Sequence, residues 1–97
     1  MTISVFLDLR LTPEGVTRAP AMLREILADT RAFKGCEGVD VLIDHQDPTH
    51  LILAERWAST EADAAYRQWR ATYGATQLGT LLASAPITSS FENATNI

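Results

Sequence analysis

The sequence lacks the features that mark a small secreted domain or a membrane protein. Its single cysteine, Cys36, has no second cysteine to pair with, so an intrachain disulfide is excluded. The N-terminus lacks the basic start, apolar run and cleavage site of a secretory signal. No apolar run approaches the roughly 20 residues that span a bilayer. We therefore expect a reduced, soluble, cytoplasmic protein.

Positive charge is also scarce. Eight Lys and Arg stand against twelve Asp and Glu, which gives a net charge of −4. Proteins that bind nucleic acids neutralise phosphates with clustered basic residues, whereas these eight are spread through the chain. Nucleic acid is therefore not an expected partner. With 46% hydrophobic residues and few Gly and Pro, the 97 residues have the composition of one folded domain.

The first third of the chain changes from a period of two to a helical period. Residues 2–11 alternate between an aliphatic side and a mostly polar side, which predicts a strand. Apolar residues at helical spacing then predict a helix that ends at Gly35. Pro20 is compatible with this helix if it begins no earlier than about Val16, because the first N–H groups of a helix have no partner within it.

The rest of the chain contains a hairpin pattern, a second helical pattern and a last short strand. Asp47-Pro48-Thr49 predicts the turn of the hairpin, and Ser59 is a good N-cap for the second helix. The predicted elements are, in order, strands at 38–46 and 51–58, a helix between Ser59 and Gly74, a short helical turn at 78–82 and a strand at 87–91.

The order strand, helix, strand, strand, helix, strand is that of a ferredoxin-like α+β fold, with both helices on one face of a four-stranded antiparallel sheet. We expect one domain over residues 1–92 and a tail over 93–97. The other sheet face would remain open, yet residues 51–54 are apolar on both faces and Phe6 adds a ring to that side. A second copy packed sheet on sheet would bury it, so we expect a homodimer.

Three short motifs give the chain a family resemblance. Gly35-Cys36-Glu37-Gly38, Asp47-Pro48 and Glu55-Arg56-Trp57-Ala58-Ser59 resemble, in order and separation, the signature of the antibiotic biosynthesis monooxygenase (ABM) family. The resemblance implies a dimeric α+β barrel with a pocket between sheet and helices in each subunit. The family includes oxygenases that act on polycyclic phenols or quinols without metal or flavin.

The same family includes haem-degrading enzymes, which rely on an Asn in the first strand and a His in the second helical region. This chain has no Asn in residues 2–11 and no His after His50. We therefore expect no haem and no other cofactor.

Both Trp and both Tyr lie between positions 57 and 73. If their stripe faces the sheet, flat rings with polar tips converge on a space that suits a planar aromatic guest. The alternative is that the rings simply form the core, and both can hold together. Trp57 and Trp69 are the candidate substrate walls, and Tyr66 and Tyr73 the candidate hydroxyls. The helical pattern predicts that four polar residues face away from this stripe: Glu61, Arg67, Gln68 and Arg70.

His45 ends the apolar row of the strand predicted at 38–46, where a neutral imidazole could remove a phenolic proton. The alternative is an exposed His beside a turn. His45, Tyr66 and Tyr73 are therefore the candidate catalytic residues. His45, Asp47 and His50 have no recognised metal-ligand spacing, so no metal is predicted.

Glu55 points to the same strand face as Trp57. Since a carboxylate is rarely buried without a partner, a structural role is expected for it.

Two classes of function remain open at this point. One is a cofactor-independent monooxygenase that acts on an aromatic or quinol-type small molecule in a pocket between sheet and helices. The other is a non-catalytic small-molecule-binding or accessory domain of the same dimeric fold, which the lack of a clear acid–base pair favours. The sequence does not name a substrate.

Overall fold

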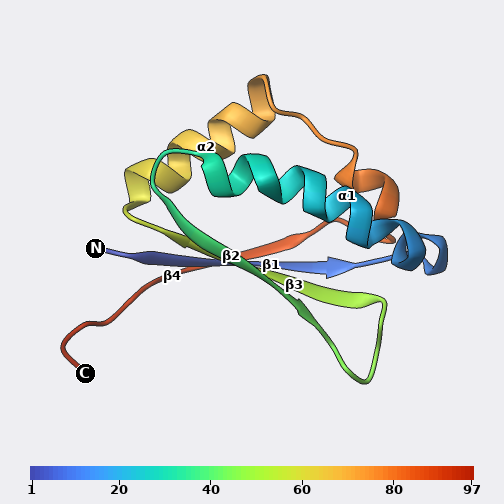
Figure 1. The fold of residues 1–97 in the computed structure, drawn as a ribbon. Coiled ribbons are helices and arrows are strands. Elements are labelled where there is room, and N and C mark those ends of the chain that lie inside the picture. Colours follow the sequence, from blue (N-terminus) through green and yellow to red (C-terminus); the bar gives the residue numbers. More distant parts are fainter.

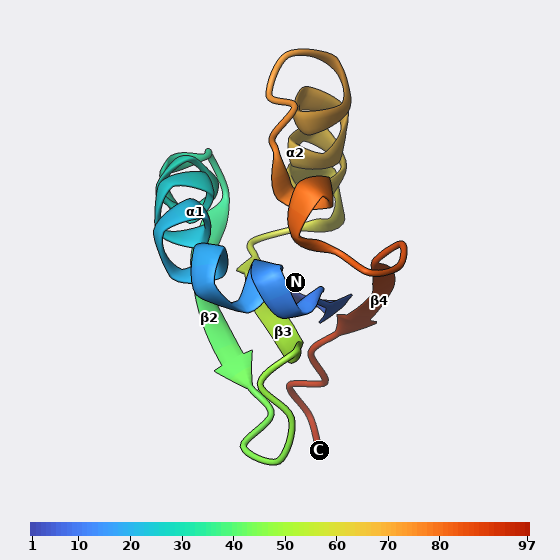
Figure 2. The same ribbon diagram turned by 90° about the vertical axis from the view of Figure 1, so that its right-hand side faces the viewer.

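The computed structural model describes residues 1–97 as an antiparallel sheet in the order β2-β3-β1-β4, with both helices on one face (Figure 1). Seen from the end, the helices lie in one layer with α1 on the β2 side (Figure 2). This arrangement confirms the ferredoxin-like α+β fold. The elements are β1 Ile3–Arg10, α1 Pro13–Ala32, β2 Cys36–Ile43, β3 His50–Trp57, α2 Thr60–Thr72, the 3₁₀ helix η1 Leu78–Leu81 and β4 Ile87–Glu92.

The first helix begins at Pro13, earlier than the start predicted near Val16, which was wrong. The Thr12 hydroxyl caps the helix by accepting a hydrogen bond from the Gly15 N–H at 3.0 Å. Proline suits the first helical position because no hydrogen bond is needed there. Pro20 consequently lies inside the helix, where it has no N–H to donate to the preceding turn. None of the helices combines the length and apolar character that a bilayer span requires.

The second helix starts as predicted. The Ser59 hydroxyl accepts a hydrogen bond from the Ala62 N–H at 3.1 Å. Acidic residues lie in the first turn and Arg70 in the last, which matches the direction of the helix dipole. The helix ends at Thr72, close to the predicted stop at Gly74. Its one fully buried side chain is Tyr66.

The hairpin strands are displaced from their predicted bounds. β2 ends at Ile43 rather than reaching residue 46, so His45 lies in the turn and not on a strand face. Asx-type hydrogen bonds divert the backbone there. The Asp44 carboxylate accepts from the Gln46 N–H at 2.9 Å, and the Asp47 carboxylate accepts from the Thr49 N–H at 3.0 Å.

Two groups of buried side chains fill the space between the sheet and the helices. The first is aliphatic and lies under α1, where it contains Leu9, Leu23, Leu27, Leu51, Leu53 and Leu81 among others. The second lies under α2 and contains Ile3, Val5, Trp57 and Tyr66. Their strand residues all come from one face of β1, β2 and β3, as the period of two predicts.

The opposite face of the sheet has no helix over it and carries exposed apolar side chains. Phe6 of β1 packs edge-on against Phe91 of β4, with ring centroids 5.8 Å apart. Phe91 remains 56% exposed and Leu42 of β2 49% exposed. The strand register puts Ile52 and Ala54 of β3 between them on this face. We call this surface the open sheet face.

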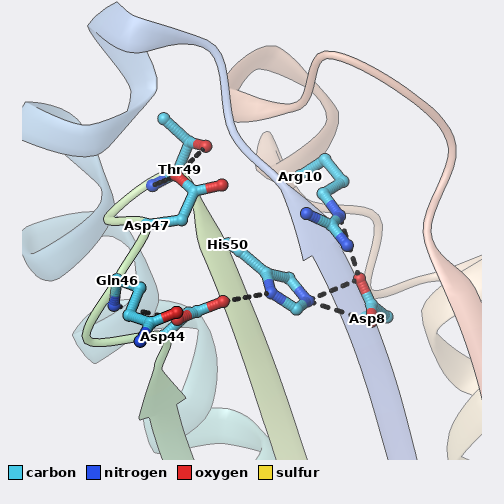
Figure 3. Close-up of polar contacts among 7 residues, drawn as sticks. All are labelled: Asp8, Arg10, Asp44, Gln46, Asp47, Thr49 and His50. Carbon is cyan, nitrogen blue, oxygen red and sulfur yellow. Dashed lines mark hydrogen bonds and ion pairs between the residues drawn. The ribbon is translucent and has the colours of Figure 1, made fainter.

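A polar cluster ties the hairpin turn to β1 at one end of the open sheet face (Figure 3). His50 Nε2 lies 3.0 Å from the Asp8 carboxylate and His50 Nδ1 lies 3.1 Å from the Asp44 carboxylate. Arg10 also contacts Asp8 at 3.5 Å. The Asp8 hydrogen bond, followed by the Asp44 hydrogen bond, raises the pKa of His50 against the smaller opposing effects of burial and Arg10. The imidazolium form of His50 therefore stabilises the turn more than the neutral form does.

We predict that His50 makes the folded state more stable at pH 6 than at pH 8. A raised folded-state pKa gives a contribution that is complete below the unfolded value of about 6.5 and is lost as the pH rises through the folded value. His50→Gln should remove this dependence, as measured by urea unfolding at both pH values. His45→Gln, in the same turn, is the matched control. An unchanged pH dependence in His50→Gln would show that the cluster does not act this way.

Candidate functional site

A cleft of about 220 Å³ opens between the two helices above the sheet. Ile26 and Leu27 of α1 form one wall, and residues of α2 form the other. Leu7 and Leu53 provide an apolar floor, and residues 74–76 with Leu78 close one side. The polar side chains that line the cleft are Glu55, Tyr66, Arg67, Arg70 and Thr76. The cleft is thus apolar below and has two guanidiniums on the α2 side, one of which is paired with Glu55.

Glu55 is the buried charge of this site. It lies on the helix-facing side of β3 between Leu53 and Trp57 and is only 2% exposed. Its carboxylate accepts a hydrogen bond from the Trp57 indole N–H at 3.0 Å and pairs with the Arg67 guanidinium. Arg67 also donates to Asp63 at 3.0 Å. A buried carboxylate is stable only when its oxygens accept hydrogen bonds from donors such as a guanidinium. The pairing with Glu55 therefore holds Arg67 at the cleft.

Tyr66 carries the hydroxyl of the cleft. Arg70 Nε donates to this oxygen at 2.8 Å, and the Thr30 hydroxyl lies 2.6 Å from it. A guanidinium can only donate, and the Thr30 hydroxyl donates to the Ile26 carbonyl at 3.3 Å. The Tyr66 proton therefore points to Thr30, and the Arg70 cation lies on the phenolic oxygen.

Arg70 links the helices and borders a second hollow. Its Nη2 donates to the Ile26 carbonyl at 2.8 Å and its Nη1 to the Gly74 carbonyl at 3.1 Å. The second hollow, of about 450 Å³, shares Ile26, Arg70 and residues 74–76 with the cleft. Arg70 and the segment 74–76 therefore form the wall between an outer hollow and the inner cleft.

The predicted substrate walls take different positions. Trp57 is fully buried and stacks at a tilt under Tyr66, with centroids 4.8 Å apart, so it supports the cleft from below. Trp69 is half-buried and lines the outer hollow, with the Arg70 guanidinium over its ring at 4.7 Å. Phe33 packs against both, which makes the rings one continuous aromatic group.

The three candidate catalytic residues are not brought together. Tyr66 lines the inner cleft, whereas Tyr73 is 85% exposed and lines the outer hollow. His45 lies in the exposed turn between β2 and β3. Of the three candidates, only Tyr66 lines the cleft.

Arg67 and Arg70 are the site residues that the helical pattern assigned wrongly. Both were predicted to face away, yet both are partly buried and line the cleft. Arginine stems lie along apolar surface and carry the guanidinium to a partner well away from the direction of the Cβ atom. The available signal was Tyr66 itself, because Arg70 follows it by one helical turn and can reach its hydroxyl.

Comparisons with known proteins give one family. The family model for antibiotic biosynthesis monooxygenase matches residues 2–77. A Deinococcus radiodurans structure that carries the same family name is 26% identical to this chain. The alignment covers 100% of this chain and 96% of that chain, with a TM-score of 0.81. No curated protein matches the chain.

Two other solved structures share the fold at lower identity. A Mycobacterium tuberculosis protein is 23% identical, with 97% of this chain and 96% of that chain covered and a TM-score of 0.76. A conserved Methanosarcina mazei protein is 15% identical, with 97% and 94% covered and a TM-score of 0.83. With the family match over most of the residues that build the sheet and the cleft, the chain belongs to the antibiotic biosynthesis monooxygenase family.

Proposed function

We propose that this chain is a cofactor-independent monooxygenase that binds an aromatic or quinol-type small molecule in the cleft between its helices. The observation that carries the proposal is the Tyr66 hydroxyl with the Arg70 cation on its oxygen, at the wall of an apolar cleft. An apolar floor suits a ring system, and a small set of convergent polar groups fixes its orientation. The family relationship supports the same reaction class.

The chemistry asked of the protein is to stabilise a substrate oxyanion. In the reaction of an anthrone-like methylene with dioxygen, one oxygen atom becomes the new carbonyl and the other leaves as water with the two methylene hydrogens. The substrate supplies all the electrons, so no external reductant is needed. The substrate reacts as its anion, which has given its proton to solvent and is electron-rich enough to react with dioxygen.

Tyr66 and Arg70 have the chemistry for this task. Tyr66 would turn its one hydroxyl hydrogen from Thr30 to the substrate oxygen, and Arg70 would place positive charge where the negative charge develops. Arg67 lies at the same wall, but Glu55 and Asp63 balance its charge, so Arg70 is the cation without a carboxylate partner. The walls of Leu7, Leu27 and Leu53 would exclude water from the reactive oxygen adduct.

A non-catalytic binding function is the second candidate, and one observation favours it. The polar groups of the cleft are already satisfied by one another, because no buried side-chain nitrogen or oxygen lacks a partner. A substrate oxygen must therefore displace or share one of these hydrogen bonds. A domain that holds a ligand against the apolar floor would need no such exchange.

We predict that Tyr66→Phe lowers the oxygenase rate by roughly a hundredfold or more, because it removes the hydroxyl that positions the substrate oxygen. Oxygen uptake would be measured with metal-stripped protein and a panel of hydroquinones and anthrone-like phenols. His45→Ala and Tyr73→Phe, which lie outside the cleft, should retain the wild-type rate. Unfolding curves would establish that Tyr66→Phe is folded.

Three outcomes of this assay have distinct meanings. Turnover that falls only in Tyr66→Phe supports both the class and the site. Turnover that falls instead in His45→Ala or Tyr73→Phe would contradict the proposed site. Binding of the panel with no uptake above the autoxidation blank would favour the binding domain.

We also propose that two copies pack through their open sheet faces. A lone sheet in water would keep Phe6, Phe91 and Leu42 in contact with solvent, whereas a two-fold partner would bury them. The open face has polar side chains at its end, around His50, which suits the rim of an interface.

We predict a dimer by sedimentation at micromolar concentration. Phe91→Asp should shift the protein towards the 10.6 kDa monomer, because a carboxylate would be buried without a partner. Ala28→Asp, on the exposed side of α1, is the matched control and should leave the dimer intact. A stable wild-type monomer under these conditions would overturn the proposed assembly.

A further inference from the structure

A third cavity lies on the other side of α1 from the cleft, and most of its lining residues are apolar. It has a volume of about 460 Å³. Leu23 and Leu27 of α1 line one side, and Val41 and Ile43 of β2 line the other. Leu51 of β3 forms part of its floor. We call this cavity the α1–β2 groove.

The α1–β2 groove and the cleft are separate sites. Leu27 is the one residue that lines both, and its buried side chain stands between them. The cleft adjoins an aromatic group and contains a buried carboxylate, whereas the groove is lined by aliphatic side chains and contains no acid and no aromatic ring. The two cavities therefore suit different ligands.

The side chains of β2 in this groove are left in contact with water. Val41 is 37% exposed and Ile43 is 64% exposed, although both lie on the strand face that carries the core. Each exposed aliphatic side chain costs free energy that burial would recover, at about 25 cal/mol per Å². A flexible apolar ligand that lay along α1 would cover them.

The only charged side chains of the groove are two arginines without acidic partners. Arg24 and Arg31 are seven residues apart on α1, or about 10 Å along the helix axis. Arg31 donates through Nη2 to the Val39 carbonyl at 2.9 Å. Arg24 makes no hydrogen bond or ion pair with the rest of the chain, whereas Arg10, Arg56 and Arg67 all pair with carboxylates. Arg24 is thus a free guanidinium beside an aliphatic groove.

We propose that the α1–β2 groove binds a medium-chain alkyl carboxylate, with its carboxylate on Arg24 and its chain against the aliphatic walls. A guanidinium matches the geometry of a carboxylate and binds it through two parallel hydrogen bonds. Arg31 adds positive charge at the far end of the groove. The lack of aromatic lining favours an alkyl chain over a planar ring.

Octanoate and 1-octanol are matched probes for this proposal, because they share a chain and differ in charge. Both would be titrated into methyl-labelled protein and followed by NMR. Saturable shifts are expected at Leu23, Val41 and Ile43, with octanoate bound about tenfold more tightly than octanol. Arg24→Gln should bring octanoate down to the affinity of octanol and leave octanol unchanged.

Two further variants separate the charge from the apolar contact. Ile43→Ser should weaken both ligands. Arg18→Gln, on the same helix but outside the groove, should weaken neither.

The proposal is overturned if octanoate and octanol bind equally, if Arg24→Gln has no effect, or if the shifts map to Leu7 and Leu53 of the cleft. It is also overturned if a second copy of the chain occupies the groove. In that case the methyl signals of Val41 and Ile43 would shift with protein concentration, and octanoate would not bind. The oxygen-uptake assay is independent of each of these results.

Discussion

The cleft depends on one buried carboxylate. Glu55 is almost inaccessible to water, and a lone charge there would be very costly. The Trp57 indole and the Arg67 guanidinium satisfy it, and Arg67 is in turn held by Asp63. Because Glu55 lies on β3 and both Arg67 and Asp63 lie on α2, this interaction fixes the helix to the sheet at a defined rotation.

The rotation of α2 then determines what the cleft contains. With Arg67 held over Glu55, Tyr66 is directed towards α1, where its hydroxyl meets Thr30. Arg70, one turn later, joins the Tyr66 oxygen to the Ile26 carbonyl and so bridges the two helices. The polar bridge spans an apolar floor. The cleft is the space below this bridge, which the core side chains do not fill.

The sequence predicts the fold well because hydrophobic periodicity reports which face of each element is buried. It predicts ends less well. The Asx turns of Asp44 and Asp47 end β2 early, and the Thr12 cap starts α1 early. These ends are set by hydrogen bonds between side chains and backbone, which the hydrophobic periodicity does not report.

The sequence predicts the lining of the candidate site only in part. Helical spacing shows neither how far a long side chain extends nor which other element packs against a residue. Tyr66 and Tyr73 share a helical stripe, but only Tyr66 has the sheet and α1 against it, so Tyr73 is exposed. Arg67 and Arg70 were predicted to face away because helical spacing describes the direction of the Cβ atom and not the reach of a long side chain. Their partners, Glu55 on β3 and Thr30 on α1, come from other elements, which only the tertiary structure identifies.

The most direct test of this account is a double-mutant cycle on Glu55 and Arg67, measured by urea unfolding. Arg67→Met alone should cost roughly 3 kcal/mol, since it leaves the Glu55 charge buried with the indole N–H as its remaining partner. Glu55→Gln added to Arg67→Met should recover much of that loss, because the charge is gone while the hydrogen bond from Trp57 can remain. Additive costs within about 0.5 kcal/mol would contradict the account, because the two residues would then be energetically independent.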